Sequence, residues 1–135
     1  MTESAPKILI VDDDATWRAL LEDALRREGF EVIAESRGDR VMATIDLHRP
    51  EVVVLDNQLP GATGLFLLAF LHDRWPDLPV LLMTAFGGPL VAEQAQRVGA
   101  RRYLDKPFPL ADLVGEVRRL TRAREASGSG DGRSA

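Results

Sequence analysis

The sequence contains no cysteine among its 135 residues, which excludes disulfide scaffolds, thiolate zinc sites and cysteine nucleophiles. It also lacks any apolar run close to the roughly 20 residues that a membrane-spanning helix needs. Residues 1–6 include no basic segment, so we expect no secretory signal. The 21 acidic and 17 basic residues give a net charge of −4, which does not favour a nucleic-acid binder. We therefore expect a cytoplasmic protein without a membrane span or direct contact with nucleic acid.

The composition is that of an ordinary globular domain, with 45% hydrophobic and 28% charged residues. A chain of this length accommodates one domain, and we find no internal repeat. The last ten residues are rich in glycine and serine, a composition typical of flexible chain. We expect one domain over residues 1–125 and a disordered tail over 126–135, which can be a native end, a linker or a remnant of cloning.

Five short apolar runs alternate with five segments of helical periodicity. The predicted strands are Ile8–Val11, Val32–Ala34, Val52–Leu55, Val80–Met83 and Tyr103–Leu104. The predicted helices are Ala15–Glu28, a segment from Val41 that ends before Pro50, Leu65–His72, a segment from Pro89 that Gly99 closes, and Leu110–Leu120. Three of the runs are continuous rather than alternating, which is typical of strands buried on both faces of a parallel sheet.

This alternation predicts an α/β fold, a (βα)₅ three-layer sandwich with right-handed crossovers. For five strands we expect the flavodoxin-like order 2-1-3-4-5. In such a sheet, ligands bind beyond the carboxyl ends of the strands, where the order reverses between strands 1 and 3. The residues at these strand ends are therefore the candidate site.

The strand ends carry chemically active side chains. Asp12 and Asp13 follow the first strand, Asp56 the third, Thr84 the fourth, and Lys106 the fifth. Clustered carboxylates need neutralising, and hard oxygen ligands of this kind suit Mg²⁺. The three aspartates sum to a charge of −3, which one Mg²⁺ and Lys106 balance. We assign the neighbouring Asp14 to capping the first helix.

The same groups suit phosphoryl transfer. A carboxylate can act as nucleophile and form an aspartyl phosphate. Catalysis then depends mainly on positioning and on neutralising the phosphoryl oxygens. Lys106 and a divalent cation supply positive charge there, and the Thr84 hydroxyl can donate a hydrogen bond.

Five blocks of residues, four of which include the residues at the strand ends, follow one another along the chain: Ile8–Asp14, Val53–Gly61, Met83–Gly87, Gly99–Ala100 and Tyr103–Phe108. Taken in this order, they resemble the receiver domain of two-component response regulators, a CheY-like domain. The resemblance extends from about Lys7 to Leu120, nearly the whole folded part.

The resemblance implies a role for each residue of the site. Asp56 is the expected phospho-acceptor, and Thr84 and Lys106 are expected to contact the phosphoryl group. Asp12, Asp13, Asp56 and the backbone carbonyl of Gln58 are the expected Mg²⁺ ligands. Thr84 and Tyr103 are the expected switch pair, and the Lys106–Pro107 peptide bond is expected to be cis, which costs little before proline.

The resemblance also implies partners. The expected phosphoryl donor is a sensor histidine kinase or a histidine phosphotransfer protein. Phosphorylation is expected to change the surface of the fourth helix, fifth strand and fifth helix, and so to control a downstream protein. The sequence does not decide whether this surface also forms a homodimer. Such a domain catalyses only its own phosphoryl transfer and autodephosphorylation, so we do not expect an enzyme.

Two alternatives remain from the sequence. The chain can be the receiver portion of a longer regulator that carries an output domain. Asp12 to Thr16 also fits the D-x-D-x-T pattern of haloacid-dehalogenase-type phosphohydrolases, with Asp12 as nucleophile, but that hypothesis leaves the block after Asp56 unexplained.

Three further features depart from the receiver pattern. Phe66 and Phe70, and separately Leu90 and Val91, are candidates for exposed apolar contact surfaces. Phe86, two residues past Thr84, is a candidate for slowing dephosphorylation by covering the site. The sequence does not identify the cognate kinase or the pathway.

Overall fold

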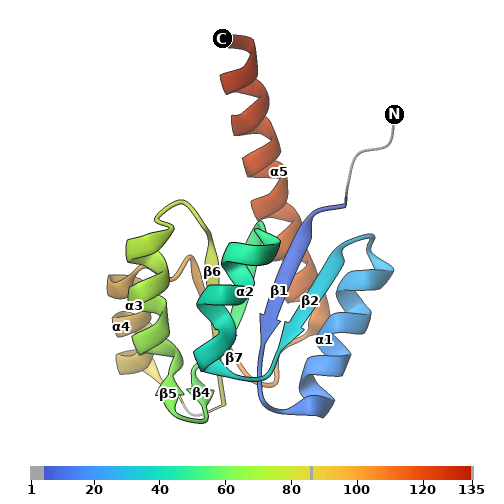
Figure 1. The fold of residues 1–135 in the computed structure, drawn as a ribbon. Helices are drawn as coiled ribbons and strands as arrows, with labels where there is room; N and C mark the ends of the chain where they lie inside the picture. The colour runs from blue at the N-terminus through green and yellow to red at the C-terminus, as the bar shows by residue number, and fades with distance from the viewer. Residues whose placement is uncertain (1–4, 86, 135) are drawn as a thin grey trace.

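The computed structural model describes residues 5–85 and 87–134 (Figure 1). Strands and helices alternate along the chain, with one short hairpin and one 3-10 helix added. The strands are β1 (Lys7–Val11), β2 (Glu31–Glu35), β3 (Val52–Asp56), β4 (Gln58–Leu59), β5 (Ala62–Thr63), β6 (Val80–Thr84) and β7 (Arg102–Asp105). The helices are α1 (Ala15–Arg27), η1 (Gly38–Arg40), α2 (Val41–His48), α3 (Gly64–Arg74), α4 (Pro89–Val98) and α5 (Leu110–Ser134).

Five strands form one parallel sheet in the order β2-β1-β3-β6-β7. When only these strands are counted, this is the predicted order 2-1-3-4-5, so the fold prediction is confirmed. Every residue of the central strands β3 and β6 is buried. Their continuous apolar runs follow from this position, because helices cover both faces of the sheet.

The two faces of the sheet carry separate hydrophobic cores. Ile8 and Ile10 of β1 pack toward α1 and α5, whereas Leu9 and Val11 pack toward α2, α3 and α4. This division follows from the alternation of side chains along a strand. Figure 1 shows α1 and α5 on one side of the sheet and the other helices on the opposite side.

A small hairpin, absent from the sequence-based prediction, follows the carboxyl end of β3. Strands β4 and β5 are antiparallel, and the pairing of Leu59 with Ala62 leaves Pro60 and Gly61 as the turn. Gly61 has φ +82°, which glycine adopts without steric cost, and a proline–glycine pair suits a tight turn. The hairpin lies beside the candidate site at the lower edge of the sheet in Figure 1.

Helix α5 extends further than the sequence predicts. It runs to Ser134 and so includes most of the Gly/Ser-rich segment expected to be a disordered tail. Adding residues to a helix that is already formed costs little compared with starting one, which allows such an extension. The domain boundary after residue 125 stays a prediction. Although α5 has 25 residues, neither it nor any other helix in the described part of the chain combines the length and apolar character needed to cross a membrane.

Candidate functional site

The register of the parallel strands brings the predicted residues together. Asp56 ends β3, Thr84 ends β6, and Asp12 and Lys106 directly follow β1 and β7. Val11 pairs with Leu55 in the sheet, so the ends of β1 and β3 lie side by side. Because all five strands run the same way, these side chains meet at one edge, beyond the carboxyl ends.

Three carboxylates gather there. One oxygen each from Asp12, Asp13 and Asp56 lies within 4.8 Å of the other two. Asp12 and Asp56 are buried, and Asp13 is exposed to solvent. An all-oxygen set that is open on one side suits a divalent cation that keeps part of its water. The cluster is therefore a site that can bind a metal ion.

Lys106 is the cation inside this cluster. Its Nζ donates to Asp12 Oδ2 at 2.6 Å and lies 3.3 Å from Asp56 Oδ1. Three carboxylates and one ammonium leave a formal charge of −2 when all are ionised. That residual charge is what a divalent cation neutralises, so the donor set fits a metal such as Mg²⁺.

Asp56 is a buried carboxylate whose two oxygens are not both hydrogen-bonded within the described residues. Its side chain is almost fully buried, and Oδ1 receives no hydrogen bond from any described residue, despite the ion-pair distance to Lys106. Burial and, after it, the negative charge of Asp12 raise the pKa of Asp56, and Lys106 lowers it, so that the pKa lies at about 6. A backbone hydrogen bond from Gln58 also lowers this pKa.

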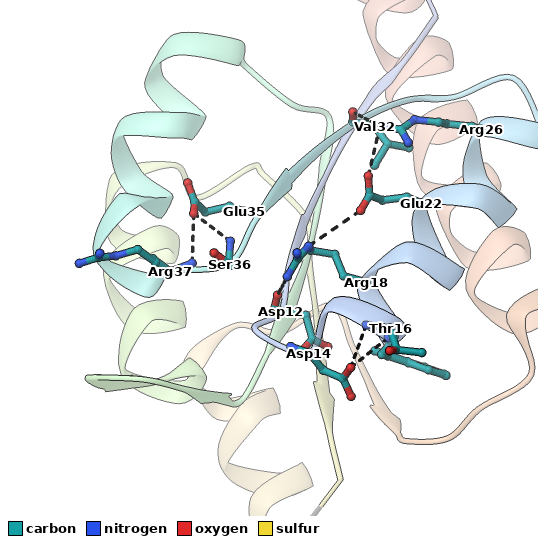
Figure 2. Close-up of polar contacts among 11 residues, drawn as sticks. Asp12, Asp14, Thr16, Arg18, Glu22, Arg26, Val32, Glu35, Ser36 and Arg37 are labelled. Carbon is teal, nitrogen blue, oxygen red and sulfur yellow. Dashed lines mark hydrogen bonds and ion pairs between the residues drawn. The ribbon is translucent and has the colours of Figure 1, made fainter.

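Asp12 is held from several directions. The backbone N–H of Asp14 donates to its Oδ1 at 2.9 Å, and Lys106 occupies its Oδ2. Its own backbone N–H donates to the carbonyl of Glu35 on β2 at 3.1 Å. Its carbonyl accepts from Arg18 Nη1 at 2.6 Å, as Figure 2 shows. The position of this carboxylate is therefore determined before any ligand binds.

Asp14 caps α1, as predicted. Its Oδ1 accepts from the backbone N–H groups of Thr16 and Trp17 at 3.0 and 3.2 Å (Figure 2). These are two of the donors that the first turn of a helix leaves unpaired. Asp14 therefore belongs to the helix start, and the neighbouring Asp12 and Asp13 belong to the carboxylate cluster.

The chain after Asp56 turns back tightly against it. Gly64 N–H donates to the Asn57 carbonyl at 2.7 Å, and Leu65 N–H donates to Asn57 Oδ1 at 3.0 Å. A Cβ atom at Gly64 would lie 2.5 Å from the Asp56 carbonyl oxygen, which only glycine avoids. Gln58 lies in β4, and the role of its carbonyl as a metal ligand stays a prediction.

Thr84 and Tyr103 approach each other around Gly87. A Cβ atom at Gly87 would clash with the Tyr103 hydroxyl and would lie 2.7 Å from the Thr84 methyl group. Thr84 is fully buried, and Tyr103 Oη donates to Asp105 at 2.9 Å and accepts from Gly88 N–H at 3.3 Å. The structure thus brings the two residues together, while their action as a switch pair stays a prediction. The Lys106–Pro107 peptide bond is cis.

The two apolar contact surfaces predicted from the sequence, Phe66 with Phe70 and Leu90 with Val91, are partly exposed. Phe66 and Phe70 are 62% and 48% exposed and stack edge to face, with ring centres 5.1 Å apart. They border an apolar hollow of about 690 Å³ between α3, the β4–β5 turn and the start of α2. Leu90 is 67% exposed and Val91 is half-buried. Phe86, the candidate cover of the site, lies outside the described residues.

Sequence reasoning missed two residues that border the site. Arg18 contacts the Asp12 carbonyl, and the Trp17 ring lies 6.0 Å from Lys106 Nζ and edge-on to Phe108. Both residues fit the amphipathic pattern of α1, so nothing in the local sequence separated them from ordinary helix positions. Their contacts depend on where α1 begins relative to the ends of β1 and β7.

Comparison with known proteins agrees with this geometry. The family model of the response regulator receiver domain matches residues 8–118. The chain is 40% identical to the response regulator protein FleR of Pseudomonas aeruginosa, covering 82% of this chain and 24% of FleR. It is 36% identical to the transcriptional regulatory protein PrrA of Mycobacterium leprae, covering 92% of this chain and 53% of PrrA. The chain thus spans between a quarter and about half of these relatives.

Solved structures give the same result. A CheY-like receiver domain protein from Methanospirillum hungatei superposes with a TM-score of 0.84 at 26% identity, covering 91% of this chain and 99% of that one. NtrX from Brucella abortus, solved with ADP, superposes with a TM-score of 0.84 at 31% identity, covering 94% of this chain and 29% of NtrX. These matches do not favour the phosphohydrolase alternative. The chain belongs to the response regulator receiver domain family.

Proposed function

We propose that this receiver domain accepts a phosphoryl group on Asp56 from a sensor histidine kinase or a histidine phosphotransfer protein. The observation that carries the proposal is Asp56 Oδ1, a buried carboxylate oxygen without a hydrogen bond from the described residues, 3.3 Å from the Lys106 ammonium. An Asp56 oxygen attacks phosphorus and forms a P–O bond. The bond from phosphorus to the donor breaks, and the donor nitrogen keeps the electron pair.

Charge neutralisation is the main task of the residues around Asp56. Lys106 pairs with Asp12 and approaches Asp56, so its ammonium is placed to attract the oxygens of an incoming phosphoryl group. Asp12 and Asp13, with Asp56 and the Gln58 carbonyl, are the proposed ligands of Mg²⁺. When bound, this ion supplies positive charge against the phosphoryl oxygens. Thr84, buried at the end of β6, is the proposed hydroxyl donor.

The proposed output is a change of the surface formed by α4, β7 and α5. An aspartyl phosphate adds negative charge and acceptor oxygens, which favour an arrangement in which Thr84 and Lys106 contact it. Tyr103 shares its surroundings at Gly87 with Thr84, which supports a coupled movement of the two. The domain then acts as a cytoplasmic switch on a protein partner or a second copy, without turning over an external substrate. It does so alone or as part of a longer regulator.

The test is phosphoryl incorporation from acetyl phosphate, with and without Mg²⁺. We expect labelling of the wild type that requires Mg²⁺ and is lost in Asp56→Asn. The matched control is Asp14→Asn. Asp14 is an exposed aspartate that lies near the cluster and caps α1, and this variant is expected to be labelled like the wild type. Intact mass and mapping of the modified peptide identify the acceptor.

Labelling that persists in Asp56→Asn and is lost in Asp12→Asn would overturn the proposal and favour a phosphohydrolase-type nucleophile at Asp12. Absence of labelling in the wild type, with acetyl phosphate and with a panel of histidine kinases, would indicate a receiver that signals without phosphate.

A further inference from the structure

Arg18 contacts the backbone of the carboxylate cluster from the second turn of α1. Its Nη1 donates to the carbonyl oxygen of Asp12 at 2.6 Å, and its side chain is 22% exposed (Figure 2). A short hydrogen bond from a guanidinium to a carbonyl is stronger than one between neutral groups. Arg18 therefore holds a specific peptide group rather than lying free in solvent.

That peptide group joins two of the three clustered aspartates. The carbonyl of Asp12 and the N–H of Asp13 share one planar unit, so the position of the oxygen determines the orientation of the whole plane. The preceding peptide is held as well, because Asp12 N–H donates to Glu35 on β2. Asp13 is exposed, so its direction toward Asp12 and Asp56 depends on this backbone.

Arg18 belongs to a row of charged side chains along α1. Glu22 lies 3.9 Å from Arg18 Nε and 3.2 Å from Arg26 Nη2. Arg26 in turn donates to the carbonyl of Val32 on β2 at 3.3 Å. Figure 2 shows the three side chains as a row that follows α1 from the end of β1 to β2. Arg18 and Arg26 thus make the same kind of contact, but only Arg18 touches the cluster.

We propose that Arg18 is a positioning residue for the divalent metal site, which it pre-organises by fixing the peptide group between Asp12 and Asp13. The inference rests on the proposed metal-dependent function. It also predicts the direction in which the affinity for the metal changes when Arg18 is removed. As a cation beside the cluster, Arg18 disfavours metal binding by repulsion, so charge alone predicts tighter binding when it is removed. Positioning predicts weaker binding, because outer groups that orient metal ligands typically contribute about 10- to 100-fold in affinity.

The experiment is isothermal titration of the full chain with MgCl₂, in the wild type, Arg18→Met, Arg18→Lys and Arg26→Met. We expect Arg18→Met to raise the dissociation constant for Mg²⁺ by about tenfold. Arg18→Lys, which keeps a donor and the charge, is expected to recover part of that loss. Arg26→Met removes the equivalent contact to Val32 and is expected to lower the melting temperature without changing Mg²⁺ affinity.

Unchanged or tighter Mg²⁺ binding in folded Arg18→Met would overturn the inference and leave the proposed function intact. An equal loss of affinity in Arg26→Met would overturn it too, since the effect would then be general destabilisation. If Arg18→Met does not fold, Arg18→Gln, which removes the guanidinium and its charge, decides, and wild-type Mg²⁺ affinity in it would overturn the positioning role. A wild type that binds no Mg²⁺ would overturn the proposed metal site and this inference together.

Discussion

Asp56 is buried next to the negative charge of Asp12. In the absence of metal, ionising Asp56 therefore lowers the free energy of unfolding of the protein. The pKa of Asp56 is raised from 3.8 to about 6, first by burial and then by Asp12. Between these values the folded state keeps a proton that the unfolded chain has lost. The stabilisation from protonated Asp56 is therefore complete below about pH 4 and is lost as the pH rises through about 6.

Replacing Asp56 with asparagine removes this pH dependence, because the amide does not ionise. At pH 7.5 in chelator, we expect Asp56→Asn to increase the free energy of unfolding by about 1–3 kcal/mol, the upper value being a shift of about two pKa units. At pH 4 the gain is expected to vanish. Urea denaturation at both pH values measures this, and an equal gain at both would show that ionisation of Asp56 is not the cause.

The start of α3 illustrates how elements shape the site. Gly64 packs directly on the backbone of Asp56 and Asn57, where an added Cβ atom would meet atoms at 2.5 and 2.6 Å. Backbone cannot move aside as a flexible side chain does. The first turn of α3 and the end of β3 must therefore shift together if Gly64 is replaced.

We expect Gly64→Ala to reduce the free energy of unfolding by about 2–4 kcal/mol and to slow phosphorylation, because it displaces the peptide after Asp56. The matched control is Gly115→Ala in α5, where nothing lies within 4 Å of the added atom. That change is expected to stabilise the protein by about 0.5–1 kcal/mol, the helix propensity difference between the two residues. Chemical denaturation of both variants checks the pair, and similar effects in the two would contradict the packing argument.

At the scale of the whole molecule, α5 closes one core and then continues beyond it. Its last buried positions with described side chains are Leu120 and Thr121. Leu120 belongs to the core that α1 and α5 form against the sheet. The domain boundary expected after residue 125 therefore falls just past these packed residues.

Two truncations test that boundary. Deleting residues 126–135 is expected to leave the melting temperature within about 2 °C, since no described core residue is lost. Deleting residues 120–135 also removes Leu120 and Thr121. This deletion is expected to lower the free energy of unfolding by about 2–4 kcal/mol, as for the loss of a buried leucine. Calorimetry compares the three chains. A large loss from the shorter deletion would show that the tail is part of the folded domain.

The pattern of strands, helices and strand ends was readable from the sequence. Periodicity along short segments reports burial, and parallel pairing brings the ends of β1, β3, β6 and β7 to one edge whatever the loops do. The sheet order was expected from these features, and the family was expected from the resemblance of the residue blocks at the strand ends. The grouping of Asp12, Asp13 and Asp56 was expected for the same reason, and the structure has it.

Only the tertiary structure decided the contacts that cross between elements. The β4–β5 hairpin, the approach of Gly64 to Asp56 and the bond from Arg18 to the Asp12 carbonyl have no signature in local periodicity. Arg18 and Arg26 look alike in the sequence, and each contacts a backbone carbonyl six positions away. Which of them touches the site depends on how α1 docks on the sheet, because a hydrogen bond forms only within a narrow range of distance and angle that the packing of whole elements sets.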